Sequence, residues 1–493
     1  MSSHFWGSWW FGSELLSGRV PLYANATHQP DGGRLWYIDP IGASLALPFR
    51  LLGPQVAWNA SLFLQLFAAA LSGYALGWSR FQDRWLAFLA GALLVSSPFV
   101  FGLLHSGASE YMGLAFPVLF LLVLLQIEKP RSWIGASILL ALCTVQSFYF
   151  GGFAVLLSFS LFLTSRDKRF LKVAFWGSIL STPMLGIGLF SMTEAAFSLN
   201  PPPENRIPYI AFSDWFLSPN SSLDGIVPVI YLPKISLLLI VYGFFVEWKW
   251  IRRFLPFLLL ALGPLLTWQT PVKLGDSLIY LPMAILYSSE FSPFSWIHHP
   301  YRIVAFVLPI FILLQLLVLR RFSLPFQCIA LGCIMGEAFM GTGELWPIRS
   351  TDPPNPIVSQ QTGFRINWPP SQRLARNLYL REQVYHQQPI ATGINILHLP
   401  IVRQDPLIQR LEAAMDRKKK RLTSVEPTQL FEMGFETVIL HGDLLPPYSR
   451  VESYQILVAE LGDPIHRYRN QSEFMISSEA QLGERPEKSS PKE

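Results

Sequence analysis

The chain has 493 residues, of which 51% are hydrophobic and 14% are charged, and its formal net charge is +5. The mean hydropathy of +0.34 exceeds what a water-exposed surface tolerates, so composition excludes an ordinary soluble globular protein and predicts an α-helical polytopic membrane protein. The basic residues fall largely in short clusters between apolar segments, a pattern typical of membrane topology and not of a nucleic-acid partner.

Residues 1–50 precede the first long apolar run and contain Trp9, Trp10 and the carboxylates Glu14, Asp31 and Asp39. We predict an outer-face loop here, forming half of a catalytic loop. The segment contains neither a signal peptide nor an apolar helix that would carry it across a membrane. The interpretation therefore includes a further membrane helix encoded upstream of Met1.

Ten apolar runs follow and predict a transmembrane helical domain over residues 51–340. About 20 apolar residues are needed to cross the roughly 30 Å hydrocarbon core of a bilayer. The runs are 54–77, 85–104, 112–127, 133–147, 149–164, 171–190, 234–248, 254–270, 303–319 and 324–340. The runs 133–147 and 149–164 are short and adjacent, so a hairpin that only partly crosses the bilayer is the alternative for that pair.

Basic residues occupy every second connection between these runs, and this alternation predicts the orientation. The clusters are Arg80 with Arg84, Lys129 with Arg131, Arg166 with Lys168, Arg169 and Lys172, Lys249 with Arg252 and Arg253, and Arg320 with Arg321. Those connections are expected in the cytoplasm, and residues 1–50, 105–111, 191–233, 271–302 and the C-terminal region on the outer face. The predicted location is a bacterial inner membrane, crossed several times.

The composition changes after residue 341. Residues 341–370 are rich in proline and predict a linker, and residues 371–478 predict a small extracytoplasmic α/β domain. Within it, Leu407, Ile408, Leu411 and Met415 recur with helical spacing. Segments 436–443 and 473–478 predict strands, and 453–463 predicts a helix that ends at Gly462. Residues 479–493 are charged and predict disorder.

Several segments, taken in order, carry a resemblance to a known family. They include SGRVPLYANATHQPDGG at 17–33, ALPFRLLGPQVAWNASLFLQLFAAALSGYAL at 46–76, FSDWFLSPNSS at 212–222, GPLLTW at 263–268, SPFSWIHHPYRIVAF at 292–306, YHQQPIATGIN at 385–395 and FETVILHGD at 435–443. Over nearly its whole length the chain resembles bacterial YfhO-like and related polytopic proteins of the GT-C glycosyltransferase superfamily.

The resemblance implies an enzyme that moves a sugar from a polyprenyl-phosphate carrier to a glycan, lipid or protein acceptor outside the cytoplasm. It also implies an acidic catalytic group in the first outer loop, as a base or linked to a divalent cation. This chain begins close to where that group is expected, so Glu14, Asp31 and Asp39 are the catalytic candidates. A surface role for Glu14 and turn-forming roles for Asp31 and Asp39 are the alternatives.

Four further residues are candidates for substrate binding. His105 and Glu110 share a brief connection between two apolar runs, where ionisable groups are expensive unless they line a site. Asp214 stands beside Trp215, a pairing suited to sugar, although a loop-capping Asp fits equally well. Arg302 precedes an apolar run, where a guanidinium is suited to a lipid phosphate but also extends routinely to headgroups.

Other chemistries find little support in the sequence. His298 and His299 have no third ligand at a diagnostic spacing, so no metal site is predicted there. Cys143, Cys328 and Cys333 lie inside apolar runs and are interpreted as small hydrophobic residues. P-loop, GxSxG, HExxH and CxxC motifs are absent. A transporter or flippase of lipid-linked saccharide, and a non-catalytic relative, remain the alternatives to the transferase.

Overall fold

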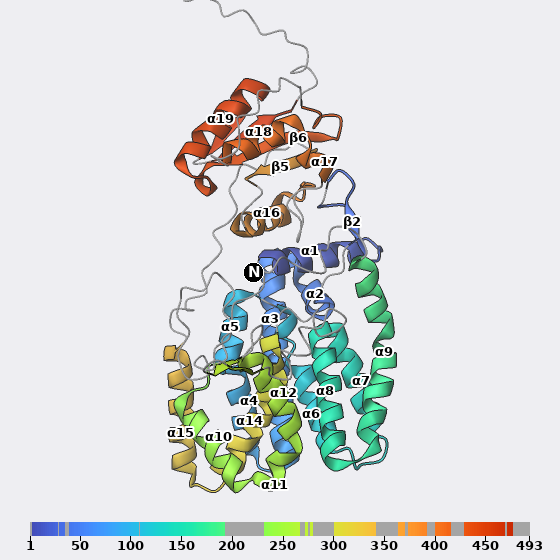
Figure 1. The fold of residues 1–493 in the computed structure, drawn as a ribbon, viewed down its shortest axis with the longest axis vertical. Helices are drawn as coiled ribbons and strands as arrows, with labels where there is room; N and C mark the ends of the chain where they lie inside the picture. Colours follow the sequence, from blue (N-terminus) through green and yellow to red (C-terminus); the bar gives the residue numbers. More distant parts are fainter. Residues whose placement is uncertain are drawn as a thin grey trace, which may run out of the picture. The chain divides into compact units, whose positions relative to one another are not determined.

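A computed structural model describes residues 2–27, 29–34, 39–107, 109–192, 231–266, 272–274, 277–279, 300–341, 363–369, 373–391, 400–415, 428–468 and 471–476 (Figure 1). Contacts within the chain divide it into two units, each described by itself below. The helical unit comprises residues 37–190 and 198–350, and the α/β unit comprises 2–36, 191–197 and 351–493. Asp214 and the predicted disordered tail, 479–493, lie outside the described residues.

A helix, or a bent pair of helices, occupies each of the ten apolar runs. They are α3 (Pro54–Phe81), α4 (Arg84–Val95) with α5 (Pro98–Ser106), α6 (Ala115–Leu125), α7 (Ser132–Gln146), α8 (Phe148–Ser165), α9 (Lys168–Met192), α10 (Lys234–Val246), α12 (Leu255–Leu266), α14 (Val304–Leu319) and α15 (Leu324–Gly341). Shorter elements of this unit are α2 (Pro40–Ala46), η1 (Leu47–Leu52), η2 (Ser109–Tyr111), α11 (Trp248–Ile251), η5 (Arg252–Phe254), η7 (Pro300–Ile303) and the hairpin β3 (Val272–Leu274) and β4 (Ser277–Ile279).

Three of the described helices, α3, α8 and α9, are long and apolar enough to cross a membrane. Helices α4 and α5 add a fourth such span if the pair counts as one, although it bends by 43° at the break before Pro98. Six further apolar helical segments, 40–52, 115–125, 132–146, 234–246, 304–319 and 324–340, have 10–17 residues. The fold is thus mostly helical with a few possible spans, and the figure of about ten spans stays a prediction.

Helix α14 forms the centre of the helical unit, since all of its 16 residues are buried. The ring of Phe306 on α14 meets those of Phe150 and Phe153 on α8 at centroid distances of 5.9 and 6.4 Å. Helices α3 and α4 pack closely, because a Cβ on Gly73 would lie 2.9 Å from the Cα atom of Gly91. Apolar burial around α14 therefore organises the bundle.

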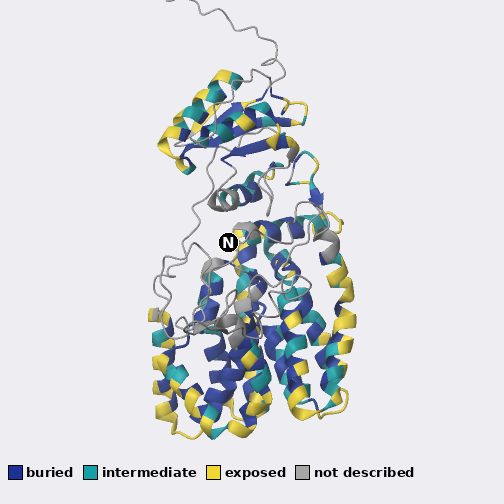
Figure 2. Cartoon of the chain, in the orientation of Figure 1, coloured by how far each residue is buried: buried dark blue, intermediate teal, exposed yellow. Residues whose placement is uncertain are grey.

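Many positions on the helices of the helical unit are exposed (Figure 2), and they include large apolar side chains. Phe63 on α3 is 66% exposed, Phe175 on α9 61%, Phe245 on α10 79% and Ile329 on α15 64%. Soluble proteins rarely expose apolar side chains of this size over a whole surface. This surface is suited to contact with lipid.

The α/β unit contains a four-stranded sheet in the order β5-β6-β8-β7. Its elements are α1 (Ser2–Leu16), β1 (Tyr23–Ala24), β2 (Gly33–Arg34), β5 (Phe364–Trp368), α16 (Arg373–His386), α17 (Pro400–Arg403), α18 (Pro406–Met415), β6 (Phe435–His441), η9 (Gly442–Leu444), α19 (Pro447–Leu461), β7 (His466–Tyr468) and β8 (Gln471–Met475). Strands β5 and β6 are parallel, and the other pairs are antiparallel.

The predicted elements of this unit are confirmed. Leu407, Ile408 and Leu411 on α18 are fully buried in the apolar core that also contains Val438 and Phe474 of the sheet. Gly462 ends α19 with a φ of +85°, a conformation that favours glycine. The predicted linker, 341–370, extends too far, because residues 364–368 form β5. Prolines 369 and 370 directly after this buried strand made the whole segment look like a linker.

The N-terminal residues belong to the α/β unit and are not a single loop over 1–50. The Trp6 indole donates a hydrogen bond from Nε1 to Oε1 of Gln383 on α16, at 2.7 Å. Gln383 Nε2 donates to the carbonyl oxygen of Ala26, which also accepts from the Ile390 backbone N–H at 3.1 Å. Residues 40–52 instead form α2 and η1 of the helical unit. Hydrogen bonds between residues more than 350 positions apart in the sequence were not apparent from local pattern.

Candidate functional site

Asp39 stands at the start of α2 and is 1% exposed. Its Oδ1 accepts a hydrogen bond from the Gly42 backbone N–H at 2.8 Å, so the carboxylate caps the helix. Pro40 follows at the first helical position, where its missing N–H does not interrupt the helix. The Asp-Pro sequence therefore has the local role expected of it, but the carboxylate also faces the interior of the helical unit.

Gln146, at the end of α7, connects this carboxylate to other parts of the bundle. Its Nε2 lies 3.0 Å from Asp39 Oδ1, 3.0 Å from the Glu110 carbonyl oxygen and 3.4 Å from Gln65 Oε1 on α3. Ser61, one turn before Gln65, donates to the Gly42 carbonyl oxygen at 2.6 Å. The α2 start, α3, η2 and the end of α7 thus meet in one buried polar cluster.

Glu110 on η2 contributes the second carboxylate of this cluster and is also 1% exposed. Its Oε1 lies 3.6 Å from Nη2 of Arg302, which precedes α14 in η7 and is 8% exposed. The guanidinium carbon of Arg302 is 4.5 Å from the ring centroid of Tyr149, in the range of a cation–π contact. Three predicted site residues, Asp39, Glu110 and Arg302, therefore come together; we call Asp39, Glu110, Gln146 and Arg302 the carboxylate cluster.

Burial changes the protonation of this cluster. All three ionisable groups lie in turns outside the apolar helices. The pKa of Asp39 is raised to about 6, mainly by burial and also by the charge of Glu110, while hydrogen bonds from Ser109, Gly42 and Gln146 oppose the rise. Burial raises the pKa of Glu110 to about 7 against the attraction of Arg302. Burial lowers the pKa of Arg302 to about 9, so the guanidinium stays charged at neutral pH.

The other predicted site residues do not join this cluster. Glu14 belongs to the α/β unit and pairs with Arg19, with Oε2 and Nε 2.6 Å apart. Asp31 is exposed in the same unit, where its carbonyl oxygen accepts from the Tyr23 hydroxyl at 2.5 Å. His105 lies on α5, but its side chain is outside the described part of the chain, as is all of Asp214. The alternative of a surface role fits Glu14.

Sequence reasoning missed Gln65, Gln146 and Tyr149. Gln65 and Gln146 lie inside the apolar runs 54–77 and 133–147, where an uncharged amide interrupts an otherwise apolar pattern. Polar groups at such positions are expensive unless they find partners inside the bundle. That interruption was the available signal. Among the described residues, no group of three or more His, Cys, Asp or Glu lies close enough to hold a metal ion.

Gly42→Ala tests how tightly the cluster is packed. A Cβ at this position would lie 2.2 Å from Asp39 Oδ2 and 2.6 Å from Gln65 Nε2, so the side chains must move. We expect a loss of about 1–3 kcal/mol of stability, typical of overpacking, seen as a lower midpoint of thermal unfolding in detergent. Gly152→Ala on α8 is the matched control, because its Cβ meets nothing within 4 Å. An equal loss in both variants would show that the space around Gly42 is not restrictive.

Comparison with known proteins does not extend this description. No known protein family, no curated protein and no solved structure matches the chain.

Proposed function

We propose that the protein is a membrane-embedded glycosyltransferase that moves a sugar from a polyprenyl-phosphate carrier to an extracytoplasmic acceptor. The supporting observation is the carboxylate cluster, in which two buried carboxylates with raised pKa values stand beside a buried guanidinium. Perturbed ionisable groups gathered at one place are typical of catalytic sites, although structural ion pairs also produce them. The exposed apolar surface of the helical unit supports the membrane setting.

The proposed roles follow from the chemistry of transfer. The acceptor hydroxyl oxygen attacks the anomeric carbon, forming the new glycosidic bond. The bond from that carbon to the phosphate oxygen breaks, and its electron pair leaves with the polyprenyl phosphate. Asp39 takes the hydroxyl proton as general base, and Arg302 neutralises the charge that develops on the phosphate. The charged Glu110 carboxylate holds the Arg302 guanidinium in position, and protonation of Glu110 weakens this attraction.

The oxygen donors of the carboxylate cluster determine whether a cofactor fits this site. A divalent cation, which the resemblance allows, would require oxygen ligands beside the phosphate. Among the described residues, Asp39 and Glu110 are the carboxylates of this cluster, and Arg302 already faces Glu110 at 3.6 Å. The fit to a dedicated cation site is poor, so no step is assigned to a metal.

The pH dependence of transfer tests the role of Asp39. A base with a pKa of about 6 is active when ionised, so the rate should fall as pH decreases through about 6. Glu110, with a pKa of about 7, is mostly protonated where Asp39 titrates, so Glu110→Gln should keep this fall near pH 6. The measurement is the initial rate of polyprenyl-phosphate release in membranes between pH 5 and 8. A rate that does not fall as pH decreases through about 6 would contradict the role of Asp39 as the base.

The decisive experiment separates transfer from transport. Purified full-length protein in proteoliposomes receives labelled polyprenyl-phosphate sugars with a mixture of glycan, lipid and protein acceptors. Release of polyprenyl phosphate that depends on acceptor supports the transferase. Movement of the labelled donor between leaflets without acceptor and without release would instead support the flippase alternative. A folded protein that shows neither release nor movement of the donor would support the non-catalytic alternative.

A further inference from the structure

The basic turns of the helical unit meet at the end of α3 remote from the carboxylate cluster. Gln126 Nε2, after α6, donates to Ser79 Oγ near the end of α3. Thr164 Oγ1, near the end of α8, donates to the Arg253 carbonyl oxygen at 3.0 Å. Arg80 lies within Coulombic range of Arg253 and Arg320. Gln65 of the site region stands 15 residues before Arg80 on the same helix, about 22 Å away along its axis at 1.5 Å per residue.

Arg320 and Arg321 pair with one carboxylate, Glu247, and Arg80 at the end of α3 and Arg253 of η5 add positive charge nearby. Glu247 Oε1, between α10 and α11, lies 2.5 Å from Arg321 Nη2 and 3.9 Å from Arg320 Nη2. Arg80 lies within Coulombic range of Glu247, as it does of Arg253 and Arg320. We call Arg80, Arg253, Arg320 and Arg321 the arginine cluster. Four positive charges and the one negative charge of Glu247 leave this region with a net positive charge.

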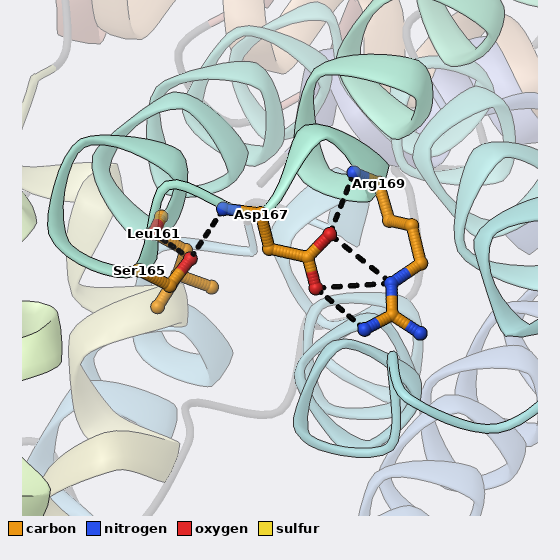
Figure 3. Close-up of polar contacts among 4 residues, drawn as sticks. All are labelled: Leu161, Ser165, Asp167 and Arg169. Atoms are coloured by element: carbon orange, nitrogen blue, oxygen red, sulfur yellow. Dashed lines mark hydrogen bonds and ion pairs between the residues drawn. The ribbon is translucent and has the colours of Figure 1, made fainter.

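Neighbouring carboxylates have other partners. Asp83 caps α4, with Oδ1 accepting from the backbone N–H groups of Trp85 and Leu86 at 2.8 and 2.9 Å. Asp167 caps α9 and holds the Arg169 guanidinium, with Oδ2 and Nη2 2.7 Å apart, as Figure 3 shows. The carboxylates of Asp83 and Asp167 thus form these hydrogen bonds within their own turns. The arginine cluster therefore lacks their compensation and is suited to an anion from outside.

The surroundings of the cluster match a lipid headgroup better than a soluble anion. Arg320 and Arg321 have side chains 45% and 44% exposed. Trp78, two residues before Arg80, is 38% exposed, and Trp248, next to Glu247, is 49% exposed. The rings of Phe322 and Phe326 stack at 4.5 Å directly after Arg321, and both are exposed. Aromatic rings beside arginines are typical of the interface between hydrocarbon and headgroups.

We infer that the arginine cluster is a binding site for the phosphate headgroup of an anionic phospholipid. The guanidinium groups would bind the phosphate oxygens, while the exposed rings and the apolar helix surfaces contact the glycerol and acyl regions. Bound lipid would join the α3 end to the α10–α11 and α14–α15 turns and stabilise the bundle. This inference rests on the membrane setting of the helical unit and is independent of the transferase activity.

The test measures lipid binding to the full-length protein in detergent micelles. Phosphatidylglycerol and phosphatidylcholine are titrated while native mass spectrometry counts bound lipid and the midpoint of thermal unfolding is followed. We expect phosphatidylglycerol to bind at least tenfold more tightly and to raise the midpoint more. The triple variant Arg80→Gln, Arg253→Gln, Arg320→Gln should lose about a hundredfold in affinity for phosphatidylglycerol and little for phosphatidylcholine, because each of the three basic residues contributes about fivefold at an anionic surface.

Two controls make the outcome decisive. Arg131→Gln, Arg166→Gln, Lys168→Gln removes the same charge from other exposed turns and should keep most of the binding. Glu247→Gln removes the competing carboxylate and should strengthen phosphatidylglycerol binding severalfold, an effect that simple loss of folding cannot produce. Equal loss in both triple variants, or weaker binding in Glu247→Gln, would overturn the inference. Equal protection by soluble inorganic phosphate would also overturn it, because the site would then select a free anion.

Discussion

Asp39→Asn should reduce acceptor-dependent release of polyprenyl phosphate by about a hundredfold or more, the usual contribution of a general base. An amide has almost the same shape as the carboxylate and still accepts from Gly42 N–H as a helix cap, so the fold should persist. What is lost is the ability to take a proton. The measurement is the single-turnover rate of release at pH 7.5, with the midpoint of thermal unfolding recorded on the same sample.

Asp83→Asn is the matched control for this variant. Asp83 also caps a helix of the helical unit, but its carboxylate accepts from Trp85 and Leu86 and lies near the opposite end of α3. It should keep a normal rate of release. A normal rate in Asp39→Asn as well would remove Asp39 from the chemistry. Loss of rate in both variants would indicate that capping, and not proton transfer, limits activity.

Arg302→Met should destabilise the helical unit by about 3 kcal/mol, because it removes the guanidinium that the buried Glu110 carboxylate faces at 3.6 Å. The double variant Glu110→Gln, Arg302→Met should recover most of this loss, since neither charge then remains. Arg321→Met removes an arginine from the exposed pair with Glu247 and should change stability by less than about 1 kcal/mol. The readout is thermal unfolding in detergent at fixed lipid content. A double variant no more stable than Arg302→Met would indicate that the two side chains act separately.

The loss of stability in Arg302→Met should depend on pH. The pKa of Glu110 in the folded protein is raised to about 7 from an ordinary value of 4.5, so the native state binds more protons than the unfolded state between these values. Stability should therefore fall as pH rises from about 4.5 through about 7. Without Arg302 the pKa rises further, so Arg302→Met should approach the wild type at pH 5 and differ most at pH 8. The opposite trend would show that Glu110 is ionised in the variant.

The elements of the fold follow closely from local pattern. Runs of apolar residues predicted each long helix of the helical unit, and the spacing of Leu407, Ile408 and Leu411 predicted α18. Gly462 correctly marked the end of α19. These features depend on neighbours within a few turns, which is why sequence alone finds them. The predictions were less successful where a segment's environment comes from distant chain, as for β5 in the predicted linker and α1 in the predicted loop.

The carboxylate cluster was only partly predictable. Asp39 was a candidate, together with Glu14 and Asp31, because the resemblance implies an acid in the first outer loop, whereas Glu110 and Arg302 were candidates because of their places beside apolar runs. No feature of the neighbouring sequence distinguishes Asp39 from Glu14 and Asp31. Asp39 is buried because the start of α2 packs against Gln146, a residue 107 positions later in the sequence. Glu14 instead pairs with Arg19, only five positions away.

The sequence by itself determined the class of the chain, the positions of its helices, the alternation of basic turns and the presence of a small C-terminal α/β unit. Hydropathy and the periodicity of helices and strands depend on neighbouring residues, so the sequence contains all the information that they require. Only the tertiary structure decided which acids are buried together, that residues 2–34 pack within the α/β unit, and that Arg80 lies near Arg253, Arg320 and Glu247. Burial, pKa and charge crowding depend on packing between distant segments, and that packing buries Asp39 beside Gln146 while Glu14 pairs with Arg19 and Asp31 is exposed.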